Sequence, residues 1–137
     1  MTRTYLATLG LLALLAAGSA FGQQGMTFNV PFEFRIGTSV MPAGEYKVTQ
    51  FLNSGLTDIA SEARKVDVRV LTHVGGRNAA PNQSKLVFNR YGDSYFLSSV
   101  WQSGADAGRV LPVSKVEREL ALRASPPPTS EIVVARR

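Results

Sequence analysis

The feature that most constrains the fold is an alternation of apolar and polar residues over short stretches separated by turn residues. From Phe28 to Ile36, apolar side chains occupy every second position, and polar residues or Pro31 stand between them. The same period of two recurs from Val66 to Val74. Successive side chains of a strand point to opposite faces of its sheet, so the pattern predicts half-buried strands. Pro31 has no N–H to donate, which predicts a sheet edge or a break in pairing there.

Turn residues divide the rest of the chain into further strands. Strands are expected at residues 45–52, 56–60, 85–91 and 94–102, and the turn-rich residues 75–84 are expected to form a surface loop. The fold class that this predicts is mainly β: an antiparallel β-sandwich or partly open barrel of about six to eight strands with one short C-terminal helix. Residues 23–124 form a single β-rich domain in this interpretation. Residues 125–137 are a proline-rich linker that could end in a final strand around 132–134.

The clearest hairpin surrounds Gly92-Asp93, a two-residue loop suited to a tight turn. This loop places Phe88 opposite Leu97, and it places Leu86 opposite Ser99. One face then carries the predicted core residues, which are Leu86, Phe88, Tyr95, Leu97 and Trp101.

The opposite face of the hairpin carries Tyr91 and Phe96. Either a second layer, formed by the helix or the last strand, covers these two side chains, or they form an exposed apolar patch available to a partner. Tyr91 and Phe96 are therefore the candidate partner-binding residues.

The helix is predicted from a capping box. Ser114 and Glu117 have the spacing at which a serine hydroxyl and a glutamate carboxylate satisfy each other's backbone N–H groups. The prolines that follow Ser125 end the helix, because proline lacks the N–H and clashes with the preceding turn.

Residues 1–22 have the order of a secretory signal peptide: a positive residue, an apolar run from Leu6 to Ala17, and small residues before Gln23. The apolar run is shorter than the roughly 20 residues that a spanning helix needs, so the protein is expected not to span a membrane. Cleavage before Gln23 would leave 115 of the 137 residues and change the formal net charge from +5 to +4. We expect an exported protein that is periplasmic or extracellular.

Composition argues against several kinds of chemistry. The chain has no cysteine and one histidine, His73, so disulfides, thiol catalysis and a typical zinc site are not expected. Nucleophile-elbow and phosphate-loop motifs are missing, and basic residues are interleaved with acids, which argues against a nucleic-acid partner. The remaining enzyme hypothesis is a small hydrolase that uses His73 or a carboxylate pair drawn from Glu33, Glu45, Asp58, Glu62, Asp67 and Asp93.

Three segments carry a resemblance to known proteins. They are the strand Val30–Phe34 with the turn Met41–Tyr46, the hairpin Leu86–Leu97, and the helix Ser114–Leu120. Together they resemble a group of small secreted bacterial β-rich proteins of unassigned function. The resemblance implies an exported β-rich domain with a helix near its C-terminus, and it implies no catalytic residues.

The function that the sequence predicts is an exported, non-catalytic binding or envelope-associated module. Its partner would be an unknown protein, an envelope component or a small apolar ligand. We expect no catalytic residues, no cofactor and no metal. The alternatives are a small-molecule carrier with a β-barrel cavity, as small barrels permit, and the small hydrolase.

Overall fold

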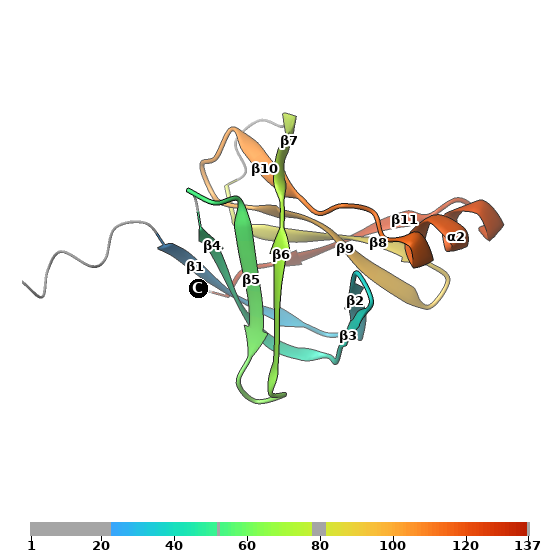
Figure 1. Ribbon diagram of the computed structural model, residues 1–137, viewed down its shortest axis with the longest axis horizontal. Helices are drawn as coiled ribbons and strands as arrows, with labels where there is room; N and C mark the ends of the chain where they lie inside the picture. The colour runs from blue at the N-terminus through green and yellow to red at the C-terminus, as the bar shows by residue number, and fades with distance from the viewer. Residues whose placement is uncertain (1–22, 52, 78–81, 137) are drawn as a thin grey trace, which may run out of the picture.

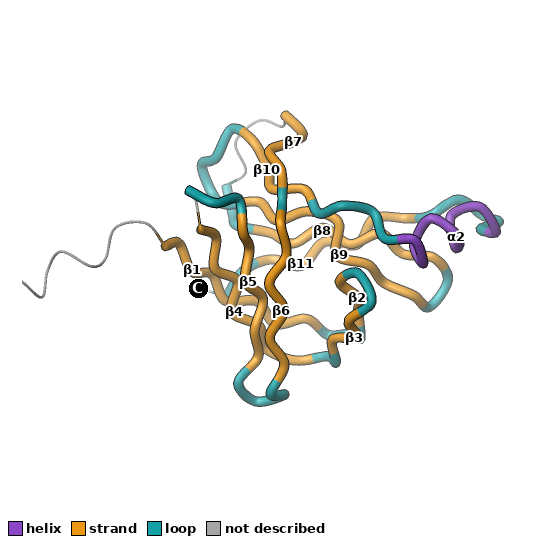
Figure 2. The backbone as a smooth tube through the Cα atoms, in the orientation of Figure 1, coloured by secondary structure: helices purple, strands orange, loops and turns teal. Residues whose placement is uncertain are grey.

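The computed structural model describes residues 23–51, 53–77 and 82–136, so the predicted signal peptide lies outside the described residues (Figure 1). The described strands are β1 (Gln23–Val30), β2 (Phe34–Ile36), β3 (Ser39–Met41), β4 (Gly44–Phe51), β5 (Leu56–Ser61), β6 (Val66–Leu71), β7 (His73–Arg77), β8 (Lys85–Tyr91), β9 (Ser94–Trp101), β10 (Ala107–Val110) and β11 (Thr129–Val134), and the helix is α2 (Lys115–Arg123). The prediction of a mainly β chain with one short helix near the C-terminus is confirmed (Figure 2). The eleven described strands exceed the six to eight expected.

The strands form two sheets. The smaller sheet has the order β1-β4-β5-β6, and the larger has the order β11-β8-β9-β10-β7, with β2 beside β9 and β3 beside β2. Strand pairs are antiparallel except for a parallel bridge between Arg35 and Phe96. Figure 1 shows β5 and β6 of the smaller sheet crossing in front of β8, β9 and β11. The predicted antiparallel β-sandwich is therefore confirmed.

The two sheets are joined along one side and separate along the other. On the closed side, Phe28 of β1 forms a bridge with Ala135, and the backbone N–H of Arg136 donates to the carbonyl of Thr27 at 2.7 Å. On the open side, β6 is the last strand of its sheet, and within the described residues it pairs with β5 alone. The described strands therefore form a sandwich that is open along one side.

Two strands that the sequence predicts as continuous are each divided between the sheets. The first ends as β1 at Val30 and resumes as β2 at Phe34, with Pro31 in the break. The second breaks at Thr72, which separates β6 in the smaller sheet from β7 in the larger one. A missing donor explains the first break. At the second, both the N–H and the hydroxyl of Thr72 donate to the carbonyl of Gly55 at 2.8 Å.

Part of the segment expected to be a loop is a strand, and one further strand is not predicted from the sequence. Gly75–Arg77 belongs to β7, and Ala107–Val110 is β10, which pairs with β7 on one side and β9 on the other. Residues 78–81 of the predicted loop lie outside the described residues.

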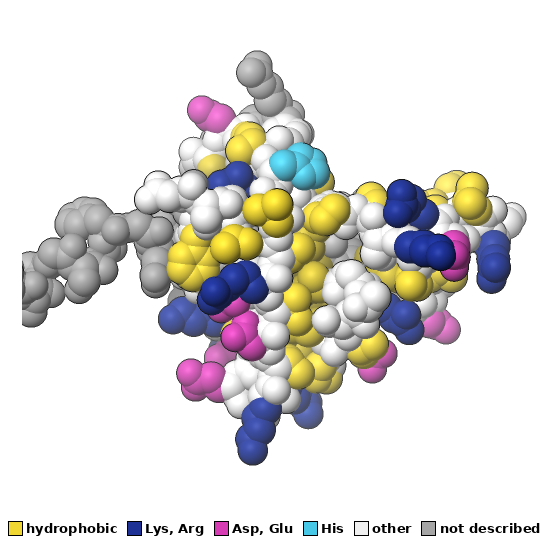
Figure 3. Space-filling model, in the orientation of Figure 1, with side chains coloured by type: hydrophobic (Ala, Val, Ile, Leu, Met, Phe, Trp, Pro, Cys, Tyr) yellow, Lys and Arg dark blue, Asp and Glu magenta, His cyan; other side chains and the backbone are white. Residues whose placement is uncertain are grey.

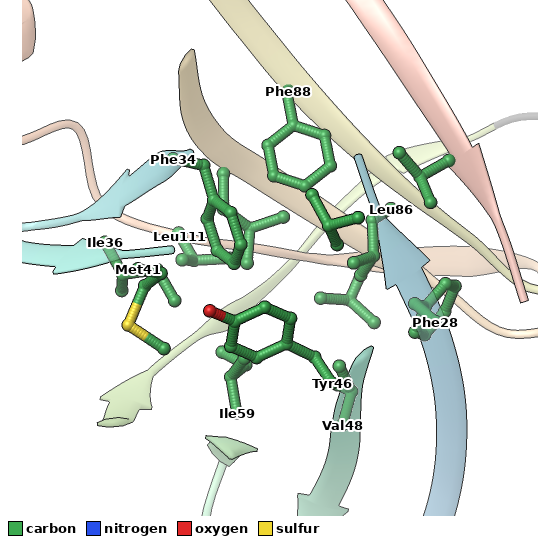
Figure 4. Packing of buried hydrophobic residues seen from close by; sticks show 14 residues of the cluster. Phe28, Phe34, Ile36, Met41, Tyr46, Val48, Ile59, Leu86, Phe88 and Leu111 are labelled. Atoms are coloured by element: carbon green, nitrogen blue, oxygen red, sulfur yellow. The ribbon is translucent and has the colours of Figure 1, made fainter. Parts of the chain in front are cut away.

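Aromatic rings from both sheets fill the space between the layers. The Phe34 ring meets the Tyr46 and Phe88 rings edge to face, with centroids 5.1 and 5.2 Å apart (Figure 4). Tyr46 donates its hydroxyl to the carbonyl of Pro42, and burial raises the pKa of this phenol. The fully buried side chains of this core include Phe28, Val30, Tyr46, Val48, Ile59, Leu86, Phe88 and Val100.

The β8–β9 hairpin has the predicted two-residue loop, but its register changes beyond the first pairs. Phe88 faces Leu97 as expected, whereas Ser99 faces Val87 rather than Leu86. One extra residue of β9 forms a bulge between these pairs, and a bulge inverts the alternation of side chains beyond it.

The bulge places Trp101 on the outer face of the larger sheet, so its predicted place on the core face is wrong. Val100 enters the core instead. Trp101 is still buried because its ring covers the backbone of Gly76 and Gly108 in the neighbouring strands. A Cβ on Gly108 would come within 2.6 Å of the indole ring. The indole N–H donates to the Ser99 hydroxyl at 3.0 Å.

Helix α2 begins where the capping box predicts. The hydroxyl of Ser114 accepts the backbone N–H of Glu117 at 3.2 Å. The helix ends at Arg123, before the prolines, and the chain then returns as β11, which pairs with β8. The C-terminal segment thus adds a strand to the larger sheet.

Candidate functional site

Helix α2 lies against the hairpin face that carries the candidate residues Tyr91 and Phe96. Their rings meet edge to face with centroids 5.8 Å apart. Phe96 is only 2% exposed and Tyr91 is half-buried. Of the two arrangements that the sequence leaves open, the structure has the one in which a second layer covers this face.

The contact between α2 and the sheet depends on Glu117. One carboxylate oxygen, Oε1, accepts hydrogen bonds from the Asn89 amide at 2.9 Å and from the Tyr91 hydroxyl at 3.1 Å. Burial raises the pKa of Tyr91, and the charge of Glu117 raises it further. Only the serine half of the predicted capping box is formed, because the glutamate bonds to the sheet instead. Glu117 is 4% exposed and holds the helix in place.

A pocket of about 280 Å³ opens beside this helix on the open side of the sandwich. We call it the open-side pocket. It is lined by residues 35–39 of the β2–β3 hairpin, by residues 68–70 of β6, by residues 111–114 between β10 and α2, and by Phe96, Leu97 and Glu117. The pocket brings together segments that are far apart in the sequence, and it includes Phe96 but not Tyr91.

Most of the pocket wall is apolar. The valines of β6 that point toward the core, Val68 and Val70, are only half-buried, whereas Val48 at the equivalent depth of β4 is fully buried. Val113, on the opposite wall, is 53% exposed. Figure 3 shows hydrophobic surface running along the front of the molecule where β6 lies. Exposed apolar surface of this kind marks binding grooves in other proteins.

Strand β6 also presents backbone groups to the pocket. Thr72, directly after β6, directs its N–H toward the β5 side, to Gly55. Alternate residues of a strand direct their N–H and C=O groups to opposite edges. The groups of Val68 and Val70 therefore also face β5, and those of Asp67 and Arg69 face the open edge.

The outer face of the smaller sheet carries two neighbouring acids, Asp58 of β5 and Asp67 of β6, with Arg69 beside them. Asp58 of β5 faces Arg69 of β6, and the guanidinium lies 3.6 Å from the Asp58 carboxylate, beyond hydrogen-bond length. That carboxylate oxygen is buried and has no hydrogen-bond partner among the described residues. Burial raises the pKa of Asp58, the neighbouring Asp67 carboxyl raises it further, and Arg69 lowers it.

The residues of the hydrolase hypothesis do not converge on this pocket. His73 is exposed at the start of β7, and the carboxylates that the structure brings together, Asp58 and Asp67, lie on the outer face of the smaller sheet. Among the described residues, no group of three or more histidines, cysteines or acids is placed to hold a metal ion.

Sequence reasoning missed the pocket residues of β6. The signal was present in Val66–Val70, where valines alternate with one acid and one base. The pattern predicts a strand with one apolar face, but the incomplete covering of that face depends on the other sheet.

Comparisons with protein-family models, curated proteins and solved structures found no match to this chain. In the described ranges, the helix is neither long nor apolar enough to cross a membrane.

Proposed function

We propose that this chain is an exported, non-catalytic binding module and that the open-side pocket is its binding site. The observation that carries the proposal is the position of the pocket at the one side of the sandwich where the sheets separate, with half-buried valines on its wall. Binding sites are concave and mostly apolar with a few polar groups, and Arg35, Ser39 and Glu117 are polar residues of this lining.

The proposal includes export, for which residues 1–22 would be the signal peptide. Cleavage before Gln23 would leave every described residue of β1 in the mature chain. N-terminal sequencing of the protein recovered from the periplasm or the medium tests this part. We expect a mature chain that begins at Gln23, and a chain that begins at Met1 would contradict it.

The core argues for this function over that of a carrier with an internal cavity. Rings of Phe28, Phe34, Tyr46 and Phe88 occupy the space between the two sheets. A ligand would therefore bind at the open edge of the sandwich.

Photo-crosslinking from the pocket wall tests the binding site. A photoreactive amino acid replaces Val113, and a matched variant carries the same residue at Leu122, which is 89% exposed on α2. We expect a discrete adduct from position 113 in the exported fraction and none from position 122. Thr38→Trp in the exposed β2–β3 turn should suppress the adduct by filling the mouth of the pocket. Equal labelling from both positions, or an adduct unaffected by Thr38→Trp, would contradict the proposal.

A further inference from the structure

We infer that the open-side pocket receives an extended segment of another polypeptide, which adds to the smaller sheet as a strand antiparallel to β6. The inference rests on the proposed function and names the class of partner for the same site. Its three supports are the backbone edge of β6, the apolar wall of the pocket and the charges on the outer face of the strand.

The first support is the backbone edge. The N–H and C=O groups of Asp67 and Arg69 face the open edge of β6, where Arg69 lines the pocket, and no described backbone hydrogen bond outside the sheet ladders reaches them. Neighbouring strands lie about 4.7–4.9 Å apart, so an added strand would occupy the space between β6 and the turn at Thr38. Main-chain hydrogen bonds would supply affinity that does not depend on the partner's side chains.

The second support is the apolar wall. Side chains of an added strand alternate between the two faces of the sheet, so every second one would point into the pocket beside Val68 and Val70. There it would meet Leu97 and Leu111, which belong to the larger sheet and to the segment after β10. The inward positions of the partner are therefore apolar.

The third support is charge. Asp67 adds a second carboxyl next to Asp58, and Arg69 is the one cation that the structure places beside this pair in the described residues. Opposite charges at facing positions of neighbouring strands attract, and like charges repel. A partner with a basic residue opposite Asp67 and an acidic residue opposite Arg69 would complete the pattern.

The sequence Val66–Val70 itself meets these requirements. If a second strand of this sequence pairs antiparallel about Val68, its arginine stands opposite Asp67 and its aspartate stands opposite Arg69. These facing residues are the ones whose backbone groups point to the open edge, so they would exchange both hydrogen bonds. A peptide with the sequence of residues 65–72, Lys-Val-Asp-Val-Arg-Val-Leu-Thr, is therefore a defined probe.

The shape of the open side favours a slender segment over a second folded copy of this chain. Figure 1 shows the β2–β3 hairpin beside β6, and α2 projects outward from the same side. Residues 37–39 and 112–114 form the far wall of the pocket. A single added strand would lie between these walls and β6, whereas a whole sheet would have to pass the walls.

The test is titration of the mature protein, residues 23–137, with this peptide and with a second peptide in which aspartate and arginine are exchanged. We expect saturable binding of the first peptide, and binding of the second weaker by about tenfold or more, since both charge pairs become repulsive. Amide exchange should slow at Asp67 and Arg69. In the double variant Asp67→Arg, Arg69→Asp the preference between the two peptides should reverse.

A matched pair of variants separates the backbone edge from the side chain. Arg69→Pro removes the side chain and the edge N–H, while Arg69→Ala removes the side chain alone. We expect Arg69→Pro to bind the peptide much more weakly than Arg69→Ala, with circular dichroism showing that both are folded. If Arg69→Pro does not fold, the reversal of charge preference decides the matter.

The outcomes distinguish this inference from the proposed function. No binding of either peptide, or equal binding of both, would overturn strand addition, while a specific adduct from position 113 would still support the pocket as a binding site. A small molecule in that adduct would also overturn the inference. Analytical sedimentation tests whether the mature protein forms dimers as its concentration rises. If it does, and if Arg69→Pro abolishes these dimers, the occupant is a second copy of this chain, which contradicts the inference.

Discussion

The closed and open sides of the sandwich are built from similar strands, but they differ in whether the edge strand is covered by the other sheet. On the closed side, Phe28 is fully buried beneath the bridge to Ala135, and Arg136 adds an ion pair with Glu45 on the surface. On the open side, no described strand covers the edge of β6, and its valines remain half-buried. Edge strands are usually blunted or covered because they template pairing with other chains. An uncovered edge next to a pocket is therefore a feature to be explained by function.

The comparison separates residues that support the fold from residues available for binding. Fully buried side chains at the closed side, such as Phe28, have exchanged water for protein contacts on all sides, and deleting one leaves a cavity. Side chains at the open side keep part of their surface in water, so deleting one removes fewer contacts. Stability measurements on matched variants can therefore test the comparison.

The largest effect is expected from Phe28→Ala on the closed side. Phe28 is fully buried, so its truncation should lower the free energy of unfolding by about 3–5 kcal/mol. Urea denaturation measures the change, with Ile132→Ala as the control because Ile132 is 57% exposed on β11. A loss below about 1 kcal/mol, within the range of ordinary substitutions, would contradict a tightly closed side.

The next effect concerns Glu117, which holds the wall of the pocket. Glu117→Ala leaves the Asn89 amide and the Tyr91 hydroxyl without their acceptor, at a cost of about 1–3 kcal/mol. Glu117→Gln keeps an acceptor oxygen and should cost less. Amide exchange in α2 should accelerate in Glu117→Ala and leave β1 and β4 unchanged. If amide exchange in Glu117→Ala accelerates in β1 and β4 as much as in α2, the loss of the helix contact destabilises the whole core, and the prediction is wrong.

Alternation of residues predicted the longer strands and the sandwich, because one face of each of these strands points toward the core. It did not predict the bulge before Ser99, because the apolar pattern continues through it with Val100 and Trp101 both buried on opposite faces. Strand β10 was missed since Gly108 suggests a loop, whereas glycine is needed there beneath the indole ring.

The candidate site was harder to predict than the fold. Tyr91 and Phe96 were chosen for their aromatic surface, and the structure shows that α2 lies against them. The pocket combines parts of three hairpins, β2–β3, β5–β6 and β8–β9, with the segment before the helix. Its existence depends on how the sheets diverge. Periodicity within one strand carries no information on that divergence.

A smaller effect should separate Val48 from Val68 under the same substitution. Val48→Ala on β4 removes two fully buried methyl groups, while Val68→Ala on β6 removes two methyl groups of a half-buried side chain. We expect Val48→Ala to cost about 2 kcal/mol and Val68→Ala to cost at least about 1 kcal/mol less. Thermal or urea unfolding of the two variants provides the comparison. Equal losses would mean that the open side is packed as tightly as the core.

The smallest effect is expected from Asp58→Asn, and its sign depends on pH. Burial and the Asp67 carboxyl raise the pKa of Asp58 in the folded protein above its ordinary value. A raised carboxyl pKa means that the folded state holds the proton more tightly than the unfolded chain does. The contribution of Asp58 to stability is then fully present below the unfolded pKa and is lost as pH rises through the folded pKa.

Asparagine does not titrate, so Asp58→Asn should gain stability relative to the natural protein as pH rises from 3 to 7. The lost ion pair with Arg69 should weigh little, because the arginine is largely exposed. Melting temperatures across this range measure the difference, with Glu62→Gln in the exposed β5–β6 turn as the control. A variant that loses stability relative to the natural protein as pH rises would show that the ionised carboxylate is well compensated by Arg69. In that case Arg69 would already compensate the negative charge beside β6, and a basic residue of a partner would add little to binding.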